Sequence, residues 1–216
     1  IAPAPGLDPA TRQAILDAAV RFASRVGYRN LGTFEFLVAP DNRFVFIEAN
    51  ARLQVEHTVT EAVTGTDLVR AQLLLAGGAS LAEAGLADIP APRGYAIQSR
   101  VCMETVAADG SVRPGGGTLS VYETPSGPGI RTDGFGYAGY RTSSAFDSLL
   151  AKVIVHSHSE EFAAAATRAD RALSEFRIEG VATNIGFLRN VLMHPDFAEA
   201  RVHTRWLDDN LSVLAT

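Results

Sequence analysis

The spacing of apolar residues near the start of the 216-residue chain predicts a helix over residues 9–26. One face of this helix would carry the apolar residues Ile15, Ala18, Ala19, Phe22 and Val26. Asp8 directly precedes Pro9, an order that is typical of an N-cap residue followed by the first helical position. Gly27 then favours the end of the helix. We therefore expect a helix that packs its apolar face on a core.

Two aromatic and β-branched runs follow, FEFLV (34–38) and FVFIE (44–48), on either side of the turn PDNR (40–43). Such runs around a Pro-Asp-Asn turn predict a β-hairpin. If all four turn residues form the loop, Val38 lies opposite Val45.

The same register places Glu35 opposite Glu48. Two carboxylates that face each other across a strand pair repel, so a positive group is expected between them. Mg²⁺ or Mn²⁺ bound to phosphate oxygens is a usual occupant of a sparse carboxylate pair beside an amide. Two exposed glutamates at the margin of a sheet are the alternative.

Polar residues occupy every second position of the run EANARLQVEH (48–57). On an extended backbone one face would carry Glu48, Asn50, Arg52, Gln54 and Glu56. The order acid, amide, guanidinium, amide, acid suits a divalent cation beside a small anion. A solvated polar face is the alternative interpretation.

After the hairpin, the capping-box spacing of residues 58–61 predicts the start of one helix. Thr66 and Asp67 predict the start of a second helix, over residues 68–76. Two prolines make residues 79–95 the natural boundary between two regions. The second region has strand-like runs and then helical runs, at 95–103, 117–122, 152–156, 160–176 and 184–193. Strands followed by helices indicate an α+β fold.

Composition narrows the function classes. A net charge of −5 argues against a nucleic-acid partner, and 47% hydrophobic residues support a packed core. No apolar run reaches the ~18–20 residues of a membrane span, and the Pro-rich start does not resemble a signal peptide. Cys102, the lone cysteine, lies in an apolar stretch and is expected to be a buried, inert thiol.

The runs FEFLV and FIEANARLQVEHTVTEAVTGTDLV (46–69) closely resemble the ATP-grasp domain of biotin carboxylases. These enzymes use ATP and bicarbonate to carboxylate biotin. The resemblance continues more loosely through GYAIQSRV (94–101), residues 137–155 and IEGVATNIGFL (178–188). Around Arg100 the sequence departs from the family pattern at several positions.

The resemblance implies a C-terminal part of an ATP-grasp domain over 1–78, a linker over 79–95, the biotin carboxylase C-terminal domain over 96–208 and a tail over 209–216. The family's glycine-rich lid and phosphate-binding lysines have no counterpart here, where Lys152 is the one lysine. The chain is therefore expected to be the carboxyl-terminal half of a biotin carboxylase and to be inactive in isolation.

The resemblance also assigns roles to individual residues. It implies that the metal is held by Glu35, Glu48 and Asn50. ATP would contact the same two glutamates and, under the adenine, Leu37. Bicarbonate would be bound by Arg52, Gln54 and the backbone of Val55. Glu56 would deprotonate bicarbonate, and Arg100 would stabilise the enolate of biotin.

The implied cofactors are ATP, Mg²⁺ or Mn²⁺, and biotin on a carrier domain outside this chain. The implied partners are biotin carboxyl carrier and carboxyltransferase domains or subunits, with a homo-oligomer as a further possibility, and the expected location is the cytoplasm or an organelle matrix. An acyl-CoA carboxylase is the favoured context, and pyruvate or urea are alternative acceptors. A non-catalytic scaffold or oligomerisation module is the competing class, and another ATP-grasp enzyme such as carbamoyl-phosphate synthase fits the 48–57 run less well.

Overall fold

The computed structural model describes residues 1–88, 90–143 and 146–215, and the chain forms two compact units. One unit is Ala4–Pro92, and the other joins Ile1–Pro3 to Arg93–Thr216. The first residues belong to the second unit because Ala2 and Ala96 exchange backbone hydrogen bonds of 2.9 and 2.7 Å. The domain limits given above stay predictions, and parts of the linker, of the 137–155 run and of the tail lie outside the described residues.

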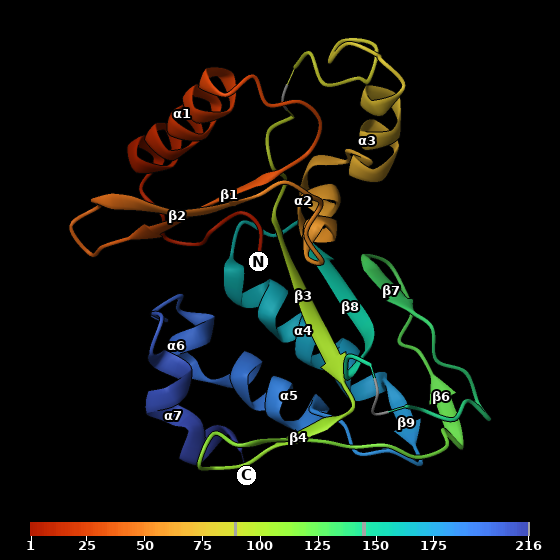
Figure 1. Cartoon of the computed structure of the whole chain (residues 1–216). Coiled ribbons are helices and arrows are strands. Elements are labelled where there is room, and N and C mark those ends of the chain that lie inside the picture. Colours follow the sequence, from red (N-terminus) through yellow and green to blue (C-terminus); the bar gives the residue numbers. More distant parts are fainter. Residues whose placement is uncertain (89, 144–145, 216) are drawn as a thin grey trace. The chain divides into compact units, whose positions relative to one another are not determined.

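The unit Ala4–Pro92 contains a long helix, a hairpin and two short helices, as Figure 1 shows. Their bounds are α1 Pro9–Arg25, β1 Thr33–Val38, β2 Phe44–Asn50, α2 His57–Thr64 and α3 Leu68–Ala76. The expected N-caps of α1 and α3 are confirmed. Asp8 accepts a hydrogen bond from the Thr11 amide, and Asp67 accepts one from the Arg70 amide, each at 2.8 Å.

The capping box predicted over residues 58–61 is wrong. Helix α2 already begins at His57, so Thr58 lies inside it and is buried. The carboxylate of Glu61 instead accepts a hydrogen bond of 2.9 Å from the Leu68 amide, the first residue of α3. Glu61 therefore links the two helices.

The hairpin register differs from the prediction near the turn and agrees with it at the carboxylates. Val38 pairs with Phe44 and not with Val45, because the loop has three residues, closed by a 2.8 Å hydrogen bond from the Ala39 amide to the Arg43 carbonyl. A left-handed residue in such a loop is typical of three-residue hairpins, and Asn42 takes that role with φ of 65°.

A β-bulge between the pairs Phe36–Phe46 and Glu35–Glu48 then restores the expected pairing. The extra residue is Ile47, which has no partner on β1. The predicted pairing of Glu35 with Glu48 is therefore confirmed. The loop is one residue shorter than predicted, and the one-residue bulge compensates for this difference.

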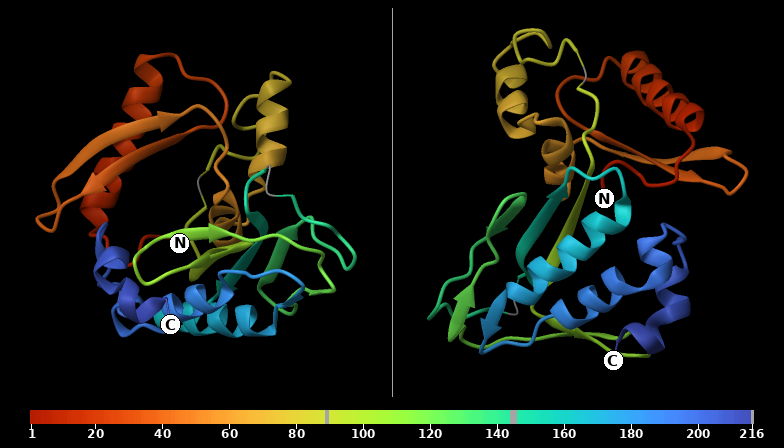
Figure 2. Two further views of the ribbon diagram at one scale, coloured as in Figure 1. Left: turned by 60° about the horizontal axis from the view of Figure 1, so that its bottom comes forward. Right: turned by 180° about the vertical axis from the view of Figure 1, so that it is seen from behind.

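The second unit is built on the antiparallel sheet β3-β8-β7, which carries α4 on one face (Figures 1 and 2). The bounds of its elements are β3 Tyr95–Cys102, β4 Glu104–Val106, β5 Val112–Pro114, β6 Val121–Glu123, β7 Ile130–Gly134, β8 Leu149–Ser157, α4 Phe162–Glu175, β9 Arg177–Glu179, α5 Ile185–Met193, α6 Pro195–Ala198 and α7 Trp206–Leu214. The α+β class predicted from the sequence is confirmed.

The core of this unit lies between α4 and the alternate residues of β3 and β8. Val101 and Val153 are buried from the sheet, and Ala169 and Leu173 meet them from α4. Small alanine side chains on α4 let the helix approach the strands closely. Each large apolar side chain buried here contributes roughly 1.5–3 kcal/mol.

The limits predicted for one strand of this unit are wrong. The strand expected over 117–122 shrinks to Val121–Glu123, because Leu119 bonds instead to Tyr140 of the following loop. Residues 209–214 lie in α7, whose residues Trp206 and Leu214 are both buried. In the parts of the chain that are described, no helix is long and apolar enough to cross a membrane.

Candidate functional site

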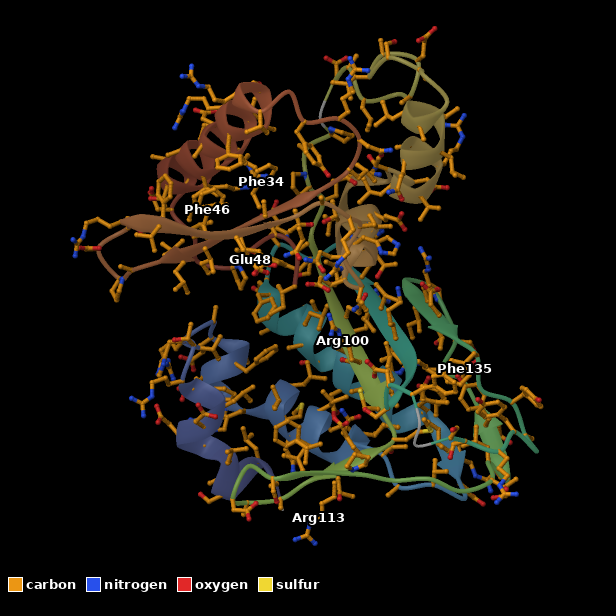
Figure 3. The ribbon with its side chains drawn as sticks, viewed as in Figure 1. Phe34, Phe46, Glu48, Arg100, Arg113 and Phe135 are labelled. Carbon is orange, nitrogen blue, oxygen red and sulfur yellow. The ribbon has the colours of Figure 1, made fainter. Side chains whose placement is uncertain are left out.

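The hairpin β1–β2 presents an aromatic face and a polar face. Phe22 of α1 contacts Phe34 and Phe46, with ring centroids 5.4 and 5.2 Å apart, so these two residues define the aromatic face. Figure 3 shows Phe34 and Phe46 on the side of α1 and Glu48 on the other side. Residues two apart share a face in a regular strand, and the bulge at Ile47 is what separates Phe46 from Glu48.

Hydrogen bonds join the polar residues of the hairpin to the loop that follows it. The Nδ2 atom of Asn50 donates to Oε1 of Glu35 at 2.9 Å and to Oε1 of Glu48 at 2.8 Å. Nε2 of Gln54 donates to the same Glu35 oxygen at 3.3 Å. Nη1 of Arg52 donates to Oε1 of Gln54 at 2.8 Å. We call these five residues the polar cluster.

The extended row predicted over 48–57 is wrong beyond Asn50, where β2 ends. The chain bends at residues 51–52 and turns at 55–56, and the Gln54 carbonyl accepts the His57 amide at 3.2 Å. The polar residues therefore meet because the loop folds back and not because a strand alternates. Glu56 is exposed and is the N-cap residue of α2, while Val55 before it is half-buried.

The polar cluster has donor groups that suit a divalent cation. Glu35 and Glu48 each place one oxygen within 2.9 Å of the same Asn50 nitrogen, so both carboxylates point to one place. Two unit charges about 4 Å apart repel by roughly 1 kcal/mol in water and roughly 4 kcal/mol near a protein surface. Each hydrogen bond to a charged group contributes about 1.5–3 kcal/mol, so the two bonds from Asn50 are of the same size as this repulsion and hold the carboxylates together.

The described residues contain no group of three or more His, Cys, Asp or Glu side chains arranged to hold a metal ion. A cation at the Glu35–Glu48 pair would therefore complete its coordination with oxygen atoms from a bound phosphate or from water. Leu37 lies two residues from Glu35 on β1, on the same face of the hairpin, and is 46% exposed. It offers an apolar surface next to the carboxylates.

Arg100 lies in the second unit, on β3, and is exposed. It lines a pocket of about 340 Å³ together with apolar residues that include Ile97, Leu188 and Phe197. Its partner across the strand pair is Lys152 of β8, which forms an ion pair of 3.4 Å with Asp133 of β7. The pocket therefore combines apolar side chains with one arginine, Arg100.

Cys102, at the end of β3, is half-buried rather than buried as the sequence predicts. Burial raises the pKa of its thiol, and the negative charge of Glu104 raises it further. The neutral thiol therefore prevails at neutral pH, which agrees with the expectation of an inert cysteine.

Sequence reasoning did not single out Asn184, the N-cap residue of α5. Its side chain makes no capping hydrogen bond and bonds instead to the backbone of β3, at Arg100 and Cys102. These residues are more than 80 positions away in the sequence, so only the folded structure reveals the contact.

Comparison with protein families assigns both regions of the chain. Residues 98–209, more than half of the chain, match the family described as "Biotin carboxylase C-terminal domain". The chain belongs to the biotin carboxylase family. Residues 1–84 match "Carbamoyl-phosphate synthase L chain, ATP binding domain".

Known relatives extend this result. The chain is 46% identical over 212 residues to the mitochondrial pyruvate carboxylase of Homo sapiens, with 97% of this chain aligned to 18% of that protein. It is 50% identical to a single-chain, multi-domain long-chain acyl-CoA carboxylase of known structure, with a TM-score of 0.94 over 99% of this chain and 23% of that one.

A third relative is the biotin carboxylase domain of the 2-oxoglutarate carboxylase of Hydrogenobacter thermophilus, solved as a dimer in complex with MgADP, ADP and bicarbonate. It is 35% identical, with a TM-score of 0.90, and the alignment covers all of this chain and 46% of that one. The chain thus spans less than a fifth of the aligned pyruvate carboxylase and about half of this biotin carboxylase domain.

The bulge leads to a prediction about two single-residue deletions in β2 of the full-length protein. Deleting Ile47 makes the hairpin regular and leaves Glu48 opposite Glu35, so Mn²⁺ affinity in the presence of ADP should change little. Deleting Ala49 turns Asn50 toward α1 and should weaken Mn²⁺ binding by roughly 10- to 100-fold. Electron paramagnetic resonance of free Mn²⁺ measures both affinities, and equal losses in the two variants would contradict this account of the bulge.

Proposed function

We propose that this chain forms the carboxyl-terminal part of a biotin carboxylase active site, in which ATP and bicarbonate are used to carboxylate biotin on a carrier domain. The observation that carries the proposal is the polar cluster, whose hydrogen bonds run from Glu48 through Asn50, Glu35 and Gln54 to Arg52. It sets a carboxylate pair beside a guanidinium group. This arrangement suits a metal–phosphate complex next to a small anion.

Glu35, Glu48 and Asn50 would hold Mg²⁺ or Mn²⁺ on the phosphate oxygens of ATP, and Leu37 would contact the adenine. A bound divalent ion would neutralise charge on the phosphates. The MgADP and bicarbonate complex of the Hydrogenobacter relative supports the pairing of these two ligands in the family. Asn50 keeps the two carboxylates together before a metal ion binds.

Arg52 would bind bicarbonate, assisted by Gln54 and the backbone of Val55. The guanidinium group is planar and presents parallel N–H donors, a geometry that matches the planar bicarbonate ion. The bond of 2.8 Å from Arg52 to Gln54 orients the guanidinium group relative to the carboxylate pair. Bicarbonate would thus lie beside the terminal phosphate of ATP.

Glu56 would act as the general base. An ordinary glutamate is ionised at neutral pH and needs only to lie within hydrogen-bond reach of its substrate. Glu56 would accept the proton of bicarbonate as a bicarbonate oxygen attacks the γ-phosphorus and ADP leaves. The product, carboxyphosphate, would break down to CO₂ and phosphate, and exclusion of water would protect it from hydrolysis.

Arg100 would stabilise the enolate of biotin, which forms when N1′ loses its proton, and the enolate would then attack CO₂. Its place in the lining of a partly apolar pocket supports this role, because the thioether ring and side chain of biotin are apolar and the ureido oxygen of the enolate is anionic. The exposed position of Arg100 allows a ligand to reach it.

We further propose that the chain works with biotin carboxyl carrier and carboxyltransferase domains, within an acyl-CoA carboxylase in the cytoplasm or an organelle matrix. The 50% identity to a long-chain acyl-CoA carboxylase supports this choice. Pyruvate is the alternative acceptor, favoured by the 46% identity to human pyruvate carboxylase. Comparing acetyl-CoA, longer acyl-CoA and pyruvate as acceptors in the full-length enzyme decides between them.

The bicarbonate and base roles predict the effects of two substitutions in the full-length enzyme. Arg52→Ala removes the bicarbonate-binding group and Glu56→Gln removes the base, so each should slow biotin carboxylation by roughly 10²–10⁴-fold. Nucleotide affinity should be nearly unchanged. Arg43→Ala is a matched control, because Arg43 lies in the hairpin turn and pairs only with its neighbour Asp41 among the described ion pairs. Normal turnover in Arg52→Ala would favour a non-catalytic scaffold.

The enolate role predicts that Arg100→Ala separates two activities. Biotin carboxylation should fall strongly, while phosphate transfer from carbamoyl phosphate to ADP should fall much less, since no biotin enolate forms in that reaction. Arg113→Ala serves as the control, because Arg113 is exposed on β5, away from the pocket (Figure 3). Equal loss of both activities would mean that Arg100 organises the site in general.

A further inference from the structure

Asn184 is bonded to β3 at two residues, Arg100 and Cys102. Its Nδ2 atom donates to the Arg100 carbonyl at 3.1 Å, and its Oδ1 atom accepts from the Cys102 amide at 2.9 Å. Its own backbone amide donates to the Cys102 carbonyl at 3.1 Å. The residue is 8% exposed, so these three bonds form largely away from water.

The bonds lie along a strand edge that has no neighbouring strand among the described residues. The order β3-β8-β7 makes β3 an edge strand of its sheet. The side-chain amide of asparagine places an NH₂ donor beside a carbonyl acceptor, so it can bond a backbone carbonyl and a backbone amide at the same time. Asn184 therefore supplies hydrogen bonds that a further strand would otherwise make, at the end of β3 opposite to the end where Ala2 pairs with Ala96.

The contact also coincides with an irregularity in the strand pairing. The register of β3 with β8 shifts between Val101 and Cys102, where Leu150 is the extra residue on β8. A bulge twists and bends a strand, and so changes the direction of the side chains beside it. Asn184 bonds on both sides of Val101, and this fixes the β3 backbone opposite the bulge, directly after Arg100.

Asn184 also connects Arg100 to the wall of its pocket. Helix α5 begins immediately after Asn184, and its residues Leu188, Val191 and Leu192 line the pocket together with Arg100. The same three hydrogen bonds thus set both the backbone that carries the guanidinium group and the start of the helix that forms the apolar wall.

We propose that Asn184 is a positioning residue for Arg100 in biotin carboxylation, a role that rests on the function proposed for Arg100. It acts through the backbone of β3 and through the start of α5. Catalytic groups must be held within a fraction of an ångström of the reactive geometry, and a displacement of about 1 Å can cost roughly 10²-fold in rate. A loss of the Asn184 bonds should therefore appear in the step that uses Arg100.

The test uses the full-length enzyme with free biotin as substrate. Asn184→Ala should lower kcat/KM for biotin by roughly 10- to 100-fold. Bicarbonate-dependent ATP hydrolysis in the absence of biotin should stay within about twofold of the wild type, since Arg100 has no task in it.

Asn190→Ala is the matched control. Asn190 lies on the same helix and its side chain also bonds a backbone carbonyl, that of Leu214 at 2.9 Å, which belongs to α7 and not to β3. Asn190→Ala should leave both activities near wild type.

A double-mutant cycle separates positioning from general stabilisation. If Asn184 acts through Arg100, adding Asn184→Ala to Arg100→Ala should cause little further loss of biotin carboxylation. Independent, multiplying losses would overturn the proposal. If Asn184→Ala fails to fold, Asn184→Gln decides the question, because it retains the amide and shifts it by one methylene. A selective loss of kcat/KM for biotin supports the proposal, and wild-type kcat/KM contradicts it.

The cycle also distinguishes failure of this inference from failure of the proposed function. If Arg100→Ala does not affect biotin carboxylation selectively, the enolate role fails first. If Arg100→Ala is selective and Asn184→Ala or Asn184→Gln is not, only the positioning role is overturned.

Discussion

The β-bulge at Ile47 is the constraint on which the polar cluster depends. Phe46 packs on Phe22 of α1, whereas Glu48, only two positions later, faces Glu35 on the other side of the hairpin. A regular strand would place both side chains on one face, and either the aromatic contact or the carboxylate pair would be lost. Because Ile47 is taken up as a bulge, Phe46 and Glu48 fall on opposite faces, and the strand has a packing face and a polar face. From that point the hydrogen bonds of Asn50 and Gln54 extend the polar cluster to Arg52.

Asparagine side chains connect elements in both units, for the same chemical reason. Asn50 donates to two carboxylates at once, which an ionised aspartate could not do, because it only accepts hydrogen bonds and would add a third negative charge. Asn184 donates to a carbonyl and accepts from an amide on the same strand edge. Asn50 thus joins two side-chain carboxylates of paired strands, and Asn184 joins backbone groups along the outer edge of β3. Both residues adjoin a bulge, where strand pairing is irregular.

Much of this arrangement could be predicted from the sequence, and the failures have physical causes. The pairing of Glu35 with Glu48 was predicted correctly because two one-residue deviations, at Asn42 in the loop and at Ile47 in the strand, cancel. The extended row beyond Asn50 failed because alternation of polar residues predicts a strand, and the loop brings the same residues together by turning back. The contact of Asn184 with β3 could not be predicted, since no local pattern reports a bond across more than 80 residues.

The most direct measurement of the central claim is the anomalous scattering of Mn²⁺ in crystals of the full-length enzyme grown with MnADP and bicarbonate. The account predicts one peak within about 2.1–2.3 Å of an oxygen atom of Glu35 and of Glu48, with bicarbonate at the guanidinium group of Arg52. A metal ion bound by phosphate alone, or by only one of the two carboxylates, would contradict the claim that the bulged hairpin brings both carboxylates to one cation.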